Sequence, residues 1–215
     1  HCHIFYGTTS FGLKPDDIGL RTGVHLLVDA GSAGAETWGA FKNYIVPESQ
    51  TMILAYLNIS SIGLVSMREY HDLRLLNPQR AAAVVTGDRA LIPGIKVRSS
   101  GLIVEEAGLK PFYLAIEAAE MAGCPLMVHM GEQPPTNDDN LSLFRSGDVL
   151  THCFHGKDTP LWLRDGEPIA SLDKALSLGV QLDLGHGAAS FDSTVARQVI
   201  SRGYYDFSIS TDLHA

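Results

Sequence analysis

The sequence has few cysteines, a minority of basic residues and no long uninterrupted apolar segment. Three cysteines among 215 residues, none in a CxxC pair, argue against a disulfide framework and indicate a reducing, cytoplasmic setting. Lys and Arg total 16 against 24 Asp and Glu, a net charge of −8, which argues against nucleic acid as a partner. No apolar run approaches the roughly 20 residues of a membrane-spanning helix, so no membrane partner is expected.

The composition is that of a chain that folds around a sizeable core. Hydrophobic residues make up 45% of the chain and charged residues 19%, which excludes a disordered chain. The length predicts one domain over residues 1–215. The chain begins at His1 without an initiator methionine or a readable secretory signal, and it ends just after an expected strand. We therefore expect an internal fragment of a longer chain.

Short apolar runs rich in β-branched residues alternate with amphipathic or alanine-rich stretches along the chain. The runs predict strands at Val24–Asp29, Met52–Ile59, Gly94–Arg98, Leu126–Met130, Asp148–Phe154, Val180–Gly185 and Phe207–Thr211. The stretches predict helices at Asp16–Thr22, Glu36–Tyr44, His71–Val85, Leu109–Ala122, Asp139–Phe144, Ile169–Leu178 and Asp192–Arg202. With an eighth strand ahead of His1, this α/β alternation predicts a (β/α)8 TIM-like barrel. A doubly wound open sheet is the alternative, although no GxGxxG motif follows an early strand.

Ionisable side chains recur at the C-terminal ends of these strands, where a barrel houses its active site. His1 and His3 are two residues apart, so both imidazoles can face the barrel axis. Lys96, His129 and His152 each lie in an apolar strand, and Asp212 follows the last strand. Each residue alone is compatible with a structural role, but their recurrence at several strand ends predicts one shared metal site.

The donor types restrict the chemistry of that site. Neutral imidazole and carboxylate suit zinc, iron, manganese, cobalt or nickel, and the sequence does not choose among these metals. An apolar setting favours the neutral amine of Lys96, which can react with carbon dioxide to give a carbamate, chemically a carboxylate. A carbamate can bridge two cations, and two divalent ions roughly 3.5–4 Å apart can share a hydroxide and polarise a carbonyl.

The segments around these residues carry a recognisable pattern. They are Gly19–Gly23, Val28–Gly34, Leu57–Leu64, Gly94–Arg98, Thr151–Phe154 with Gly156 and Lys157, Gly185–Gly187 and Ser210–His214. Together with the order His-x-His, Lys, His, His, Asp, they resemble the binuclear-metal branch of the amidohydrolase superfamily, which includes dihydroorotases, hydantoinases and D-aminoacylases. Within that branch the chain is similar to the amidohydrolase/deacetylase metallohydrolases, and the resemblance covers essentially its whole length.

The resemblance implies a metallo-dependent hydrolase barrel that holds two divalent metal ions, with zinc as the expected metal. It implies that His1 and His3 bind the more buried metal and that His129 and His152 bind the more exposed one. Lys96, as a carbamate, would bridge the two. The family also has a flanking β-sandwich built from both chain ends. That sandwich is absent here, as are most of the first strand and the final helix, so we expect a barrel that is truncated at both ends.

The resemblance also implies a reaction and a substrate class. Asp212 would bind the buried metal and act as general base while the bridging hydroxide attacks a carbonyl carbon. The expected substrate is a small molecule, either an N-acyl amino acid or an acylated hydroxy acid, cleaved at its amide or ester bond. Association into a homo-oligomer is left open.

Three further residues are candidates for substrate contacts. Arg98 lies two positions after Lys96, so it can bind a substrate carboxylate or form a structural ion pair. His186 lies between two glycines and can reach a substrate or hydrogen-bond Asp212. Asn58 ends a strand and can orient a substrate or cap its own loop.

Two other functions are compatible with the sequence. A mononuclear deaminase of the same superfamily would use the His-x-His pair, a further histidine and Asp212, but this chemistry does not need Lys96. A catalytically inactive fragment or a binding module is the non-enzymatic alternative, and the intact set of ligands weighs against it.

Overall fold

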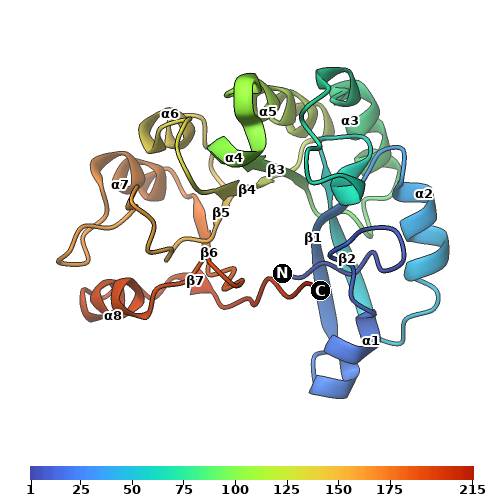
Figure 1. The fold of residues 1–215 in the computed structure, drawn as a ribbon, viewed down its shortest axis with the longest axis horizontal. Coiled ribbons are helices and arrows are strands. Elements are labelled where there is room, and N and C mark those ends of the chain that lie inside the picture. Colours follow the sequence, from blue (N-terminus) through green and yellow to red (C-terminus); the bar gives the residue numbers. More distant parts are fainter.

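The computed structural model describes all residues from His1 to Ala215 and contains one sheet of seven strands (Figure 1). The strands follow sequence order across the sheet, and each pairs in parallel with the next. They are β1 (Leu26–Gly34), β2 (Met52–Asn58), β3 (Ile95–Ser99), β4 (Leu126–Met130), β5 (Val149–Thr151), β6 (Gln181–Asp183) and β7 (Phe207–Ser208). The seven predicted strands are thus confirmed, with shifted ends.

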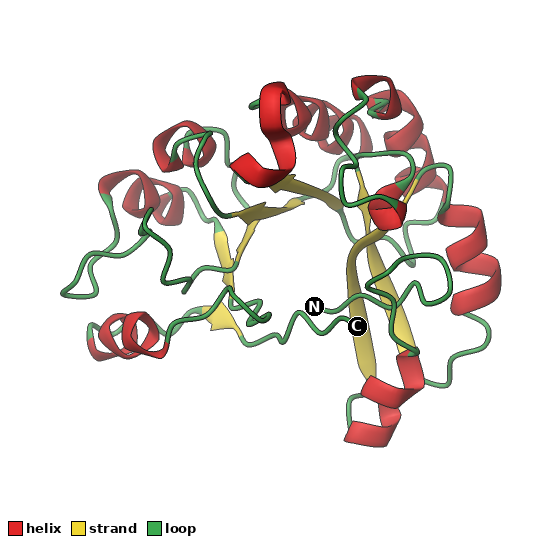
Figure 2. Ribbon diagram, in the orientation of Figure 1, coloured by secondary structure: helices red, strands yellow, loops and turns green.

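Most of the helices connect successive strands and lie on the outer side of the curved sheet (Figure 2). The α-helices are α1 (Pro15–Ile18), α2 (Trp38–Ala40), α3 (Pro78–Gly87), α4 (Gly101–Val104), α5 (Lys110–Ala122), α6 (Asn137–Leu141), α7 (Ala170–Ser177) and α8 (Ser193–Ser201). Short 3-10 turns are η1 (Leu20–Thr22), η3 (Gly63–Val65), η4 (Leu73–Leu75) and η5 (Glu105–Ala107), and a π-helical turn, η2 (Phe41–Ile45), continues α2. A doubly wound sheet would carry helices on both faces, so this arrangement matches the barrel class.

The segment around Cys2 lies between the two edges of the sheet, where it bridges β1 on one side and the chain after β7 on the other. The two chain termini lie close together (Figure 1). On one side, the Cys2 amide donates to the carbonyl of Val28 at 3.0 Å, and the Ala30 amide donates to the carbonyl of Cys2 at 2.9 Å. On the other side, the His3 amide donates to the carbonyl of Leu213 at 2.9 Å. These are isolated parallel bridges, so the structure has seven regular strands rather than the eight of a complete barrel.

Local backbone chemistry explains where the elements begin and end. The predicted strand Asp148–Phe154 stops at Thr151 because His152 takes a left-handed conformation, with φ 67°. Helix α6 begins earlier than predicted because the Thr136 side chain and Asp139 form a capping box. The turn α4 was not predicted, since four residues carry too little periodicity to be recognised.

The main hydrophobic core lies between the sheet and its helices. Alternate residues of the inner strands, such as Ile95 and Val97 of β3, are fully buried against this helical layer. Phe112 and Ala115 of α5 are fully buried in the same cluster. Because successive strand residues face opposite sides, Lys96 is directed to the inner side of the sheet.

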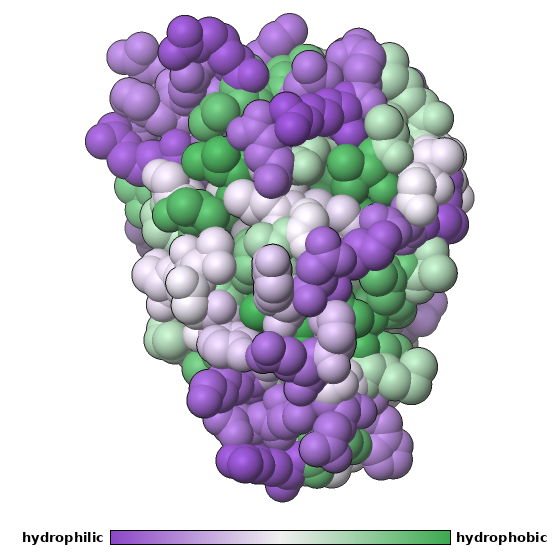
Figure 3. Space-filling view, turned by 90° about the vertical axis from the view of Figure 1, so that its right-hand side faces the viewer, coloured by the Kyte–Doolittle hydropathy of each residue, from purple (hydrophilic) through white to green (hydrophobic).

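The outer surface is mixed in character. The face that carries α1 and α2 intersperses hydrophobic with hydrophilic side chains, and its end near α1 is mainly hydrophilic (Figure 3). Among the helices, none has both the length and the apolar composition needed to cross a bilayer.

Gly34 ends β1 at a point where there is no room for a side chain. A substitution at Gly34 therefore tests how closely β1 packs against the chain after β2. A Cβ at this position would overlap the backbone carbonyl oxygen of Ser60. We expect Gly34→Ala to lower the free energy of unfolding by about 1–3 kcal/mol, measured by urea denaturation. The matched control is Gly87→Ala in α3, where no atom lies within 4 Å of the added Cβ, and this variant should be at least as stable as the parent. Equal stability of the two variants would contradict the packing described here.

Candidate metal centre

The six residues predicted as metal ligands line one cavity of about 280 Å³ on the inner side of the sheet. They reach it from the His1–His3 segment, from β3 and β4, and from the residues that follow β5 and β7; they are His1, His3, Lys96, His129, His152 and Asp212. The cavity therefore lies at the C-terminal ends of the strands, as expected for an active site in this architecture.

Asp212 is the residue around which the imidazoles gather. Its Oδ1 lies 3.1 Å from His1 Nε2 and 3.2 Å from His3 Nε2, and its Oδ2 lies 4.0 Å from His152 Nε2. Asp212 adopts a left-handed conformation, with φ 50°, which is uncommon for residues other than glycine. The amide of Asp212 donates to the carbonyl of His1 at 2.9 Å, which fixes the backbone beside the cavity.

The opposite nitrogen of each of these three rings has its own partner. His1 Nδ1 lies 2.9 Å from Asp183 Oδ2, His3 Nδ1 lies 2.9 Å from Ser32 Oγ, and His152 Nδ1 lies 2.7 Å from the carbonyl oxygen of Gly185. A carbonyl oxygen only accepts, so His152 carries its proton on Nδ1 and a lone pair on Nε2. The same tautomer lets His1 donate to the Asp183 carboxylate.

The electrostatics favour the neutral form of two imidazoles in the cavity, those of His129 and His152. Burial, followed by repulsion from Lys96, lowers the pKa of His152 to about 4. Burial, followed by the neighbouring His152, also lowers the pKa of His129 well below its ordinary value, and the two rings lie 4.4 Å apart between centroids. A neutral imidazole is the form that binds a metal.

These contacts provide a direct test of whether a cation fits. The Oδ1 atom of Asp212 is buried and receives no hydrogen bond, although imidazole nitrogens surround it. Ligand atoms of His1, His152 and Asp212 all lie within 4.8 Å of one another. Lone pairs on nitrogen and oxygen that face each other without a shared proton are mutually repulsive unless a cation lies between them. The donor set therefore fits a divalent metal.

Lys96 enters the same cavity from β3 with an amine that loses its charge easily. It is 2% exposed, and burial lowers its pKa to about 8, although the Asp212 charge opposes this shift. The stem passes directly over Gly31, because a Cβ there would lie 2.6 Å from Lys96 Cβ. Gly31 also has φ +90°, so both its space and its backbone favour glycine. The amine is thus partly neutral near pH 7, which is the form that reacts with carbon dioxide.

The three candidate substrate residues have different environments. Arg98 lines the cavity, but its Nε and Nη2 donate to Glu69 at 2.6 and 2.5 Å, which is the structural ion pair left open by the sequence. Asn58 caps its own loop, since its Oδ1 accepts from the Ser60 amide at 2.9 Å. His186 is exposed, and its ring stacks on that of Phe191 with 5.0 Å between the ring centroids. It forms no hydrogen bond with Asp212.

The sequence analysis missed the residues that hold the ligands in place. Asp29 accepts hydrogen bonds from the amides of Ile4 and Ser32, at 2.8 and 2.7 Å, and so anchors the chain beside His3. Asp183 is buried beside His1. Both aspartates interrupt apolar strands, the same signal that identified Lys96, so they could have been found by applying that signal consistently.

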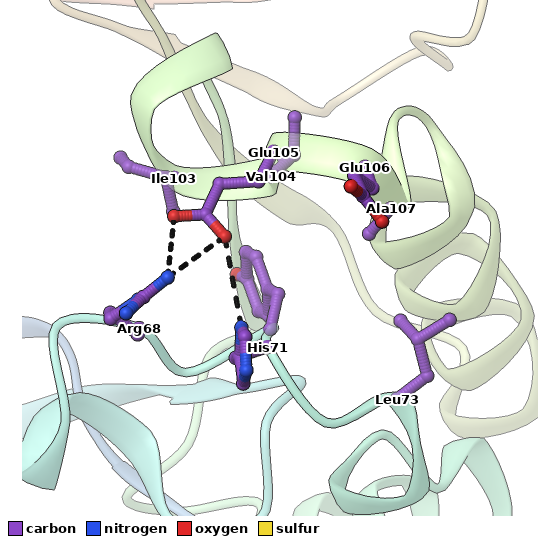
Figure 4. A pocket seen from close by; sticks show the side chains of 9 residues that line it. Arg68, His71, Leu73, Ile103, Val104, Glu105, Glu106 and Ala107 are labelled. Atoms are coloured by element: carbon purple, nitrogen blue, oxygen red, sulfur yellow. Dashed lines mark hydrogen bonds and ion pairs between the residues drawn. The ribbon is translucent and has the colours of Figure 1, made fainter.

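A second cavity of about 650 Å³ lies beside the first, between the chain before η4 and the α4–η5 segment (Figure 4). The Glu105 carboxylate points toward Arg68 and His71, with Arg68 Nη2 at 3.1 Å and His71 Nδ1 at 3.7 Å. These side chains are largely exposed, so the ion pairs contribute at most about 1 kcal/mol. The larger cavity therefore lacks the buried, converging donors of the smaller one.

Two solved structures are similar to this chain. The chain superimposes on the crystal structure of an adenine deaminase with a TM-score of 0.93 and 33% identity, covering 99% of this chain and 58% of the other. It superimposes on the crystal structure of a dihydroorotase with a TM-score of 0.88 and 39% identity, covering 100% and 57%. Both neighbours are members of the amidohydrolase superfamily, so the predicted resemblance to that superfamily is confirmed.

Three curated proteins that are similar to this chain are all named deacetylase. Proteins named deacetylase from Brucella anthropi and Agrobacterium fabrum are 40% and 39% identical over the whole chain, and one from Enterococcus faecalis is 34% identical. The chain spans 54%, 53% and 58% of these three proteins, roughly half their length. No family profile matches the chain.

The Arg98–Glu69 ion pair yields a stability prediction. The Glu69 side chain is 0% exposed, so Arg98→Met would leave a buried carboxylate without its partner. We expect a loss of about 3–5 kcal/mol in the free energy of unfolding. The double variant Arg98→Met with Glu69→Leu should recover most of this loss, because it removes both charges. If the single variant keeps its stability, the ion pair does not have the structural role assigned to it.

Proposed function

We propose that the protein is a metal-dependent hydrolase of the amidohydrolase superfamily. It would cleave an amide or ester bond of a small N-acyl amino acid or an acylated hydroxy acid. The observation that carries this proposal is the convergence of the His1 and His3 imidazoles on the unpaired oxygen of Asp212, beside a buried lysine. The relatives named deacetylase support hydrolysis at a C–N bond.

The proposed cofactors are two zinc ions. His1, His3 and Asp212 would hold the more buried ion, and His129 and His152 the more exposed one. Lys96, as a carbamate, would contribute to both, consistent with its lowered pKa and its place in the cavity. Two such ions, when bound, supply Lewis acidity toward a carbonyl oxygen and lower the pKa of water.

Asp212 is the proposed general base. Burial alone would raise its pKa, but interactions with His3, His152 and Lys96 lower the pKa to about 2, so the carboxylate is ionised at neutral pH. Its Oδ1 lies 3.2 Å from His3 Nε2, but this contact lacks the geometry of a hydrogen bond. The carboxylate can therefore accept a proton from the attacking water and pass it to the leaving amine or alcohol.

The walls of the cavity support a small substrate. A volume of about 280 Å³ is at the lower end of ordinary ligand sites, which span roughly 300–1,000 Å³. Phe11, Leu64 and Ile103 supply apolar surface, and Lys157 supplies a cation that is already paired with Glu132 at 2.6 Å. A small substrate with an apolar acyl group matches the size of this cavity and its apolar walls.

A mononuclear deaminase is the second candidate, favoured by the similarity to the adenine deaminase structure. That chemistry gives no role to Lys96, yet the lysine is buried at a cost that a structural role does not explain. A binding module without catalysis is weakened by the complete donor set in the cavity.

The lysine bridge can be tested by metal content. We expect the complete protein, loaded with zinc in bicarbonate buffer, to hold about two ions per chain. Lys96→Ala should lose at least one ion and most of its hydrolytic activity, as measured by elemental analysis and acetate release. The control is Lys174→Ala on the exposed face of α7, which should match the parent in both measurements. Unchanged metal content and turnover in Lys96→Ala would exclude the bridging role.

The reaction can be tested by a substrate screen with the zinc-loaded complete protein. The panel comprises N-acetyl and N-formyl D- and L-amino acids, acetylated hydroxy acids, hydantoins and adenine. We expect carboxylate release from acyl compounds, and removal of the metal by a chelator should abolish it until zinc is restored. Ammonia release from adenine with no acyl hydrolysis would instead support the deaminase.

A further inference from the structure

Asp183 is a buried carboxylate in the barrel interior that belongs to no set of predicted ligands. It ends β6, and its neighbours in register are Thr151 of β5 and Ser208 of β7. Its Oδ2 accepts from Thr151 Oγ at 2.7 Å and lies 2.9 Å from His1 Nδ1. Its Oδ1 accepts from Ser208 Oγ at 2.6 Å. Both oxygens are thus engaged by protein donors, and Asp183 is not among the residues that line the cavity.

These contacts determine which ring nitrogen of His1 carries the proton and which one faces the cavity with a lone pair. Thr151 Oγ lies 3.1 Å from His1 Nδ1, but it gives its own proton to Asp183. His1 Nδ1 therefore faces two acceptors and carries the ring proton. The lone pair must then reside on Nε2, which faces Asp212 Oδ1 at 3.1 Å.

Asp183 also differs from the groups that orient the other rings. His3 is held by the hydroxyl of Ser32 and His152 by the carbonyl of Gly185, both of which are neutral. His1 alone has a charged partner for its Nδ1, and it lies outside any regular strand. A carboxylate behind an imidazole fixes the ring and increases the basicity of the other nitrogen.

We propose that Asp183 is a positioning residue that sets the affinity of the His1, His3 and Asp212 group for a divalent cation. It acts through His1 by fixing the ring orientation and the tautomer, and it does not touch the ion. This inference rests on the proposed function only in requiring that the cavity binds a metal.

The experiment measures zinc affinity in the complete protein by competition with a chromophoric chelator. Asp183→Ala removes the acceptor and the charge, and we expect zinc to bind about 10–100-fold more weakly. Asp183→Asn keeps a neutral acceptor for His1 and should lie between Asp183→Ala and the parent. The matched control is Ser208→Ala, which removes a hydrogen bond to the other oxygen of Asp183 without touching His1. It should bind zinc like the parent.

Unfolding by urea, recorded for the same variants, separates positioning from a general structural role. A structural role would lower the stability of Asp183→Asn and Ser208→Ala alike while leaving the zinc affinity of both unchanged, and that result would overturn the proposal. If Asp183→Ala does not fold, the comparison of Asp183→Asn with Ser208→Ala decides alone. Failure of the proposed function is a separate outcome, namely a parent protein that binds zinc but hydrolyses no member of the acyl panel.

Discussion

The unpaired oxygen of Asp212 is the feature on which the rest of the cavity depends. It is buried, it faces the Nε2 atoms of His1 and His3, and it accepts no hydrogen bond from either ring. Such an arrangement is costly in a low-dielectric interior unless a positive charge enters it. The surrounding contacts maintain this condition, because the carbonyl of Gly185 and the carboxylate of Asp183 direct the imidazole protons away from Asp212.

The barrel architecture provides these conditions through alternation along its strands. Side chains such as Val97 pack outward against the helices, while Lys96 and Arg98 of the same strand project to the interior. Parallel pairing places the C-terminal ends of successive strands at one edge, so ligands far apart in sequence become neighbours. The Cys2 segment bridges both edges of the sheet, and these bridges place His1 and His3 at the cavity.

Two buried polar residues that the sequence offered as substrate contacts, Arg98 and Asn58, have partners within the protein. Arg98 is committed to Glu69, and the polar atoms of Asn58 are used within its own loop. Burial explains both cases, because an interior cation or amide must find a partner wherever the fold offers one. An inward-facing position therefore does not by itself show that a side chain contacts a substrate.

Strand periodicity and interrupted apolar runs are local signals, so they were enough to predict the alternation of strands and helices, the inward face of β3 and six of the residues that line the cavity. The partners that those residues meet depend on tertiary contacts. Asp183 reaches His1 across 182 positions, and Glu69 reaches Arg98 from a separate loop. Strand ends were also set by tertiary context, as the left-handed backbone of His152 shows. Contacts between distant segments depend on how the sheet closes, and no local pattern encodes that geometry.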